Sequence, residues 1–124
     1  SYLLKLRKED LEFSPYRGNI FESMIISECF KYDRNFRSGT DFYFWRDNKG
    51  VEIDLIVEKA SELSAIEIKS AKTINSSFFK NLKTYHKYAG ADLQKSFLVY
   101  GGENEQQRGS LTVLPWTSTR QIFT

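Results

Sequence analysis

The sequence predicts an α/β domain in which a mixed central β-sheet is flanked by helices. Helical periodicity appears twice, over residues 20–32 and 76–89. Between these helices, residues 42–46, 51–57 and 65–69 form three strand-like segments joined by short polar turns, which predicts antiparallel pairing. After the second helix, residues 96–100 and 111–114 add two short apolar strands. This order of elements predicts a sheet covered by helices.

Composition places the chain among ordinary globular domains. Its 124 residues suit one domain, and 40% hydrophobic with 27% charged residues is typical of soluble proteins. The net charge of +2 is too small to indicate nucleic acid by itself. A single cysteine, Cys29, excludes an internal disulfide framework and predicts a reducing, cytoplasmic location. We expect no membrane segment, because no apolar run approaches the ~20 residues that a spanning helix requires.

The first residues begin with the apolar segment Tyr2–Leu6 and then become charged, which predicts a connecting segment. Because the first residue is Ser1 rather than Met, we expect the chain to be a piece of a longer protein. We assign residues 1–13 to a connecting segment, which contains either a helical turn or an edge strand, and residues 14–124 to the domain. Asn19 can cap the first helix, which we expect to run from Ile20 to about Tyr32. Its expected buried residues are Met24, Ile25, Cys29 and Phe30.

The aromatic segment Phe42–Arg46 is predicted to be a strand, joined by the turn residues 47–50 to the next strand. We interpret its aromatic side chains as core residues rather than as a platform for stacking bases, because large aromatic side chains are mostly buried.

The central hairpin carries the residues that could bind a metal or take part in catalysis. The alternating aliphatic residues of its two strands predict one shared apolar face, made by Val51, Ile53, Leu55, Val57, Ile66 and Ile68. Pairing Leu55 with Ile66 across the polar break at residues 58–62 puts Asp54 directly opposite Glu67. Lys69 then lies on the same face as these two carboxylates.

Two opposed carboxylates repel each other, so the pair predicts either a cost in stability or a bound cation. Mg²⁺ suits such oxygen ligands, because it takes one or two protein carboxylates and fills its other positions with water and phosphate. Lys69 could neutralise a phosphate oxygen beside it. The alternative is a solvated sheet face that happens to carry charged residues.

The second helix has two stripes. Phe78, Leu82, Tyr85 and Ala89 recur at helical spacing and are expected to face inward. The other stripe is basic and is joined by a lysine of the preceding loop. These four residues either form a solvated surface or contact nucleic-acid phosphates: Lys72, Lys80, Lys83 and Lys87. The polar residues 103–108 are expected to form a mobile loop.

The segments Gly50–Leu55 and Ala65–Ser70 resemble the PD-(D/E)xK signature of restriction-endonuclease-like nucleases, although Ile53 replaces the proline that often precedes the Asp. The resemblance implies the three-layer sandwich of that fold. It also implies that Asp54 and Glu67 bind Mg²⁺ or Mn²⁺ with the carbonyl of Ile68 as a further ligand, and that Lys69 is catalytic.

A wider resemblance covers about residues 14–118. It rests on Gly18–Glu22, Phe44–Arg46, Leu98–Gly102 and Leu114–Trp116, which are similar to a domain of unknown function found C-terminal to prokaryotic AAA+-type ATPases. This implies an ATPase domain of the same full-length protein as a partner, and Glu22 as an additional metal-site carboxylate. Glu22 could instead close a capping box with Asn19. Glu28 is then the fallback carboxylate.

Together these patterns predict a Mg²⁺-dependent phosphodiesterase that acts on DNA. The chain lacks a Gly-x-x-x-x-Gly-Lys phosphate loop, so we do not expect it to hydrolyse ATP on its own. The main alternative is a non-catalytic module that binds DNA or protein and is attached to the ATPase. Cleavage of RNA is a third possibility that the same residues leave open.

Overall fold

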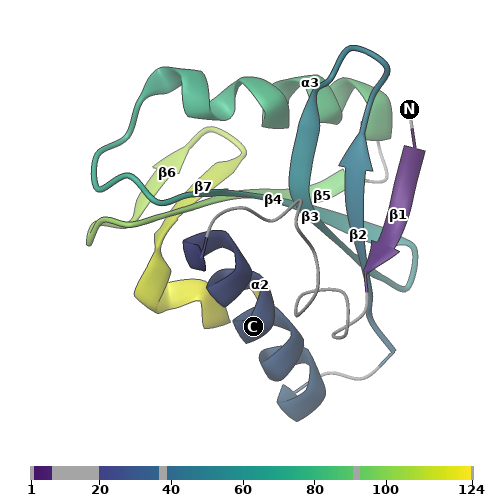
Figure 1. The fold of residues 1–124 in the computed structure, drawn as a ribbon, viewed down its shortest axis with the longest axis horizontal. Coiled ribbons are helices and arrows are strands. Elements are labelled where there is room, and N and C mark those ends of the chain that lie inside the picture. The colour runs from purple at the N-terminus through teal and green to yellow at the C-terminus, as the bar shows by residue number, and fades with distance from the viewer. Residues whose placement is uncertain (1, 7–19, 37–38, 91–92, 124) are drawn as a thin grey trace.

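In the computed structural model, residues 2–6, 20–36, 39–90 and 93–123 are described. Their strands form one mixed sheet with helices on both faces (Figure 1), which confirms the predicted α/β class. The strands are β1 (Tyr2–Leu6), β2 (Asp41–Arg46), β3 (Glu52–Lys59), β4 (Glu62–Lys69), β5 (Leu93–Tyr100), β6 (Gln106–Arg108) and β7 (Leu111–Pro115). The helical elements are α2 (Ile20–Phe36), the 3₁₀ segment η1 (Ser76–Phe79), α3 (Lys80–Ala89) and the 3₁₀ segment η3 (Trp116–Phe123).

The sheet has the strand order β1-β2-β3-β4-β5-β7-β6. From β1 to β4 each neighbouring pair is antiparallel, and short turns join β2 to β3 and β3 to β4. Strand β5 is parallel to β4 because η1 and α3 cross over between them. Of the two alternatives for the first residues, an edge strand forms in β1. The expected boundary between residues 13 and 14 lies outside the described residues.

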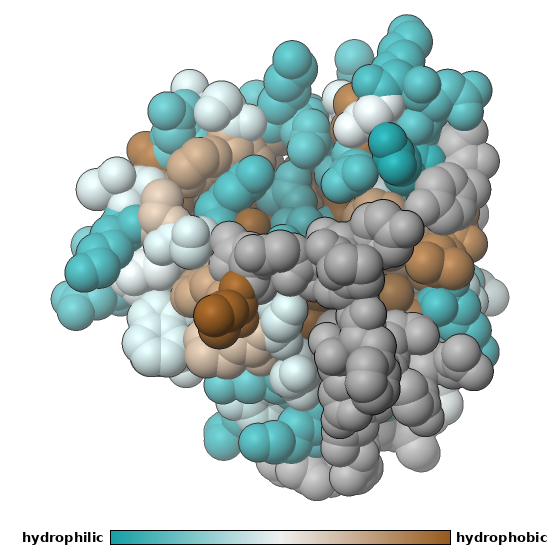
Figure 2. Space-filling view, in the orientation of Figure 1, coloured by the Kyte–Doolittle hydropathy of each residue, from teal (hydrophilic) through white to brown (hydrophobic). Residues whose placement is uncertain are grey.

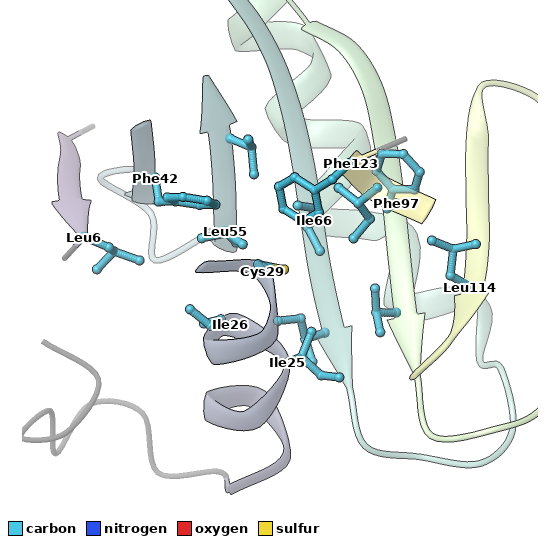
Figure 3. Close-up of a cluster of buried hydrophobic side chains, with 14 residues drawn as sticks. Leu6, Ile25, Ile26, Cys29, Phe42, Leu55, Ile66, Phe97, Leu114 and Phe123 are labelled. Carbon is cyan, nitrogen blue, oxygen red and sulfur yellow. The ribbon is translucent and has the colours of Figure 1, made fainter. Parts of the chain in front are cut away.

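Buried hydrophobic side chains pack on both sides of the sheet. Helix α2 and η3 cover one face, where Ile25, Ile26 and Cys29 point toward sheet residues such as Leu55 and Ile66 (Figures 1 and 3). Helix α3 covers the opposite face. Its buried residues pack against strands β2 to β4 in a cluster formed by Trp45, Ile53, Ile56, Ala65, Leu82 and Tyr85. The burial of Phe42 and Trp45 agrees with the core interpretation of the aromatic strand.

The helices differ from the prediction at their ends and in one buried position. Helix α2 begins at Ile20 as expected but continues to Phe36. Met24 is 37% exposed, so its predicted burial is wrong, and Ile26 at 0% exposure packs in the core instead. The predicted cap Asn19 lies outside the described residues. The second helix begins as a 3₁₀ turn, and the Asn75 side chain caps its start by accepting a hydrogen bond from the backbone of Ser77.

Strand β3 contains a β-bulge that the sequence did not predict. Tyr43 pairs with Ile56, whereas Trp45 pairs with Ile53, so Asp54 and Leu55 together lie opposite Phe44. The extra residue reverses the alternation of side chains. Leu55 therefore packs with α2, while Ile53 packs with α3. The prediction that Ile53 shares a face with Leu55 is wrong for this reason, and Val51 likewise lies against the α3 side.

The C-terminal part also departs from expectation. Gln106–Arg108 forms the short strand β6 against β7, so the loop predicted over residues 103–108 is wrong for its last three residues. All three side chains of β6 are exposed and polar, which suits a strand at the edge of a sheet. The segment η3, which was not predicted, buries Ile122 and Phe123 beneath α2. None of the described helices is long and apolar enough to cross a membrane.

Candidate functional site

The candidate site lies where strands β3 and β4 part. Their paired residues run from Lys59 opposite Glu62 to Leu55 opposite Ile66, which confirms the predicted register. At the next positions the backbone hydrogen bonding changes. The N–H of Ile68 donates to the Asp54 carboxylate, with 2.8 Å between Ile68 N and Asp54 Oδ2. The bulge and this bond hold the Asp54 side chain at the point of divergence.

The carbonyl of Ile68 faces the same gap. In a strand, the N–H and C=O of one residue point to the same neighbouring strand. Because the Ile68 N–H reaches Asp54, the Ile68 carbonyl is directed toward the β3 side as well. This is the direction that the predicted role of Ile68 as a carbonyl ligand requires.

Glu67 is the most buried charged residue of the site, at 2% exposure. Its carboxylate interacts with the side chain of Asp54, with the side chain of Asn81 on α3 and with the backbone of Asp54. One of its two oxygens, Glu67 Oε2, is buried and has no hydrogen-bond partner among the described residues. A buried acceptor without a donor is costly and calls for a proton, a water molecule or an ion.

The two carboxylates are electrostatically coupled. Burial raises the pKa of Asp54 well above its usual value, and the adjacent negative charge of Glu67 raises this pKa further. Burial also raises the pKa of Glu67. The Ile68 N–H and then the positive charge of Lys69 lower the pKa of Asp54, and the Asp54 side chain and then Lys69 lower the pKa of Glu67. Without a cation, the pair therefore favours a state in which it retains a proton.

An open cleft of about 340 Å³ adjoins this pair. It gathers side chains from α2, β3, β4, η1 and the loop after β4, and it is lined by Glu22, Asp54, Ile68, Lys69, Ser70, Ala71 and Phe78. Three of the four predicted catalytic residues, Glu22, Asp54 and Lys69, thus line one cleft, and Glu67 lies buried beside Asp54. Glu28, the fallback carboxylate, is not among the lining residues. The capping alternative for Glu22 depends on Asn19, which is not described.

Some residues of the site were not recognised from the sequence. Phe78 was predicted to face the core; it packs against the core cluster of Phe79 and Leu98, and it also lines the cleft. Gly101 and Gly102 press against the cleft wall: Gly101 N–H donates to the carbonyl of Ala71 at 2.9 Å, and a Cβ on Gly101 would clash with the carbonyl oxygen of Ser70. The Gly-Gly pair directly after a buried strand was the available signal, since only glycine allows such close backbone approach.

The predicted basic residues are all exposed. They comprise Lys72, in the loop that continues the cleft wall, and three lysines on α3: Lys80, Lys83 and Lys87. Helix α3 contains no acidic residue, and the surface over it is largely hydrophilic (Figure 2). Exposure agrees with both interpretations, a solvated face and a phosphate-binding face.

The residues present fit a hard divalent cation. No cluster of three or more His, Cys, Asp or Glu suited to a metal occurs in the part of the chain that is described. Mg²⁺ does not require one, because it binds through one or two carboxylates with water completing its octahedron. Asp54, the unpartnered oxygen of Glu67 and the Ile68 carbonyl supply oxygen donors of the required type.

Comparison with known proteins gives a family but no activity. A family model described as "Domain of unknown function (DUF4143)" matches residues 17–119, and the chain belongs to this family. The predicted membership of a family of domains of unknown function is thereby confirmed. No curated protein matches the chain.

Proposed function

For this member of the DUF4143 family, we propose the function of a Mg²⁺-dependent phosphodiesterase with a restriction-endonuclease-like arrangement, acting on DNA. The observation that carries the proposal is the coupled pair at the divergence of β3 and β4. Glu67 is buried beside the partly buried Asp54, Glu67 Oε2 lacks a partner among the described residues, and Lys69 lines the adjoining cleft. Burying two carboxylates side by side is unfavourable unless a cation compensates them.

In this proposal, Asp54, Glu67 and the Ile68 carbonyl hold Mg²⁺ or Mn²⁺, and Glu22 supplies an outer carboxylate from α2. The bound metal would polarise a phosphoryl oxygen and stabilise the charge that develops on it. Asp54 is oriented by the Ile68 N–H, and Glu67 by Asn81 and the Asp54 backbone. These bonds fix the two carboxylates before a substrate arrives, so little reorganisation is needed in the transition state.

Among the basic side chains near the cleft, Lys69 has the catalytic role in this proposal. Its ammonium, on the cleft wall, would orient the attacking water or offset negative charge on the phosphate. Lys72 and the three lysines of α3 would contact phosphates further along the strand. Because α3 has no acidic residue, its exposed face does not repel a polyanion.

A second candidate is a non-catalytic DNA- or protein-binding module that serves an AAA+-type ATPase domain of the same protein. One observation favours it: Glu67 is buried and interacts with Asn81 of α3, and it is not among the residues that line the cleft. The resemblance to domains that follow such ATPases supports this partner under either function. The buried thiol of Cys29 suits a reducing cytoplasm, which we propose as the location.

The test is a cleavage assay on single-stranded, duplex and branched DNA and on RNA, with Mg²⁺ and with Mn²⁺. Wild type should cleave at least one DNA substrate, and Asp54→Asn should not. Asp54→Asn retains the shape of the side chain while removing its charge. Cleavage that persists in this variant would indicate a contaminant or another site. Preference for RNA would change the substrate, and a wild type inert on all substrates would favour the binding module.

A further inference from the structure

Two adjacent phenylalanines in η1 have different surroundings. The backbone N–H of Phe78 donates to the Asn75 carbonyl at 2.9 Å, which fixes the direction of this turn. Phe79 is 4% exposed and packs in the core with Leu98, Tyr100 and Val113. Phe78 is only partly buried and lines the cleft. Phe78 also packs against this core cluster. The two neighbouring rings therefore differ in that Phe79 lies within the core, whereas Phe78 lies between the core and the candidate site.

The ammonium of Lys69 lies over the ring of Phe78. The distance from Lys69 Nζ to the ring centroid is 5.6 Å, within the ~6 Å range of a cation–π contact. The described residues provide no ion pair to Lys69, and its charge is felt by Asp54 and Glu67 only through space.

This arrangement holds the Lys69 ammonium in place and still leaves its positive charge available to a phosphate. A carboxylate partner would hold Lys69 firmly, but it would also neutralise the charge that a phosphate needs. An aromatic ring attracts the ammonium through its quadrupole and leaves the positive charge uncompensated. It also restricts a flexible side chain with several rotatable bonds, which lowers the entropy cost of orienting it.

We propose that Phe78 is a positioning residue, which holds the Lys69 ammonium at the cleft through its ring. The inference rests on the proposed phosphodiesterase function for its consequence, but the contact itself can be measured without activity. Phe78 is thus expected to act through Lys69, with no direct role in binding the metal.

The contact is tested by NMR. The ε-methylene protons of Lys69, assigned by comparison with Lys69→Arg, should be shifted upfield by the ring current of Phe78. Phe78→Leu should abolish this shift while preserving apolar volume, and Phe78→Trp should retain or increase it. Phe79→Leu is the matched control, because it removes a neighbouring ring that lies under Arg108, whereas Lys69 lies over Phe78. A Lys69 signal that is the same in wild type and in Phe78→Leu would overturn the proposal.

The consequence is tested by kinetics on whichever substrate wild type cleaves. Phe78→Leu should lower kcat about 5- to 30-fold, as expected for a cation–π contact of this kind, with KM and Mn²⁺ affinity nearly unchanged. Phe78→Trp should restore kcat. Phe79→Leu should lower Tm without this loss of kcat. A wild-type kcat in Phe78→Leu would refute the inference while leaving the proposed function intact. If wild type is inactive, the proposed function fails, and the ring-current measurement alone decides whether Phe78 holds Lys69.

Discussion

The two ends of the β3–β4 hairpin use similar residues in opposite ways. At the turn end, Lys59 and Glu62 pair across the strands and are exposed to water. At the open end, Glu67 is buried beside Asp54, and Lys69 lines a cleft. Charges at the turn end cost little because water solvates them. Charges at the open end are costly, which is why burial raises the pKa values of Asp54 and Glu67.

The backbone follows the same division. Near the turn, the register is regular and only the turn residues Ala60 and Ser61 adopt positive φ angles. At the open end, a bulge in β3 reverses the alternation of its side chains between the two faces of the sheet. The Ile68 N–H there donates to the Asp54 side chain instead of to a carbonyl of the neighbouring strand. The irregular backbone thus occurs where the costly charges are, and this combination distinguishes a candidate site from a solvated sheet face.

The largest expected effect is on turnover, and it distinguishes Lys69 at the open end of the hairpin from Lys59 at the turn end. Lys69→Ala should lower turnover by about 100-fold or more, since it removes a cation that stabilises the transition state. Mn²⁺ binding should be retained because the metal keeps all its ligands. Lys59→Ala at the turn end should leave both quantities unchanged. Single-turnover assays and metal titrations measure them. Equal activity in the two variants would remove Lys69 from the mechanism.

The second effect is stabilisation by metal. Mn²⁺ at ~100 times its dissociation constant should raise the free energy of unfolding by about 2.7 kcal/mol, through binding the folded state alone. Glu67→Gln should lose this gain, whereas Glu62→Gln at the turn end should keep it. Thermal melts with and without Mn²⁺ measure the difference. If melts of wild type are unaffected by millimolar metal, the open end is not a cation site.

The third effect is a pH dependence in the metal-free protein. A carboxyl group whose pKa is raised by folding keeps its proton in the folded state after the unfolded chain has lost its own. Stability should therefore fall as pH rises from about 4 to the raised pKa of the Asp54–Glu67 pair. Each unit of that difference corresponds to about 1.36 kcal/mol. Asp54→Asn should flatten the fall in urea melts with EDTA, and a fall as steep as in wild type would count against the coupled pair.

The fourth effect belongs to the turn end. Ala60 and Ser61 have φ angles of 52° and 69°, which disfavour residues with a Cβ. The double change Ala60→Asn and Ser61→Gly suits a two-residue turn with two positive φ angles. It should add about 1 kcal/mol of stability, because it relieves the steric cost of the left-handed conformation. The stabilisation by Mn²⁺ should be unchanged, because the metal acts at the other end. A reduced metal response would show that the two ends are coupled.

The smallest effect concerns the lysines of α3. Replacing Lys80 and Lys83 with Ala should reduce the slope of log K against log salt for duplex DNA by roughly 0.9 for each phosphate that is no longer neutralised. Sequence preference should not change. Lys59→Ala is the matched control from the turn end of the hairpin. Fluorescence anisotropy at several salt concentrations measures the slope. An unchanged slope would indicate that these lysines form a solvated surface and do not contact phosphates.

The regular features could be predicted from the sequence because they depend on local periodicity. The pairing of Leu55 with Ile66 follows from two short aliphatic segments and a polar break, and it brought Asp54 and Glu67 together correctly. The buried stripe of α3, with Leu82 and Tyr85, follows from helical spacing in the same way.

The features that could not be predicted depend on contacts between distant segments. The alternation of residues in β3 is interrupted by three consecutive apolar residues, Leu55, Ile56 and Val57, and the pairing with β2 shows that a bulge causes this interruption. From the sequence, Phe78 and Phe79 are equally suited to the core. Only the cap at Asn75 and the packing of η1 determine which of the two is more deeply buried. The closeness of Gly101 to Ser70 likewise depends on the parallel pairing of β5 with β4.

The measurement that tests the central claim most directly is anomalous diffraction from crystals soaked in Mn²⁺. The coupled pair predicts a peak between Asp54 and Glu67 Oε2, with the Ile68 carbonyl among the ligands. The same soak of Asp54→Asn crystals should give no peak there. Wild-type crystals that show Glu67 Oε2 hydrogen-bonded to water or to a protonated Asp54, with no manganese between the two carboxyl groups, would contradict the assignment of this site to a divalent cation.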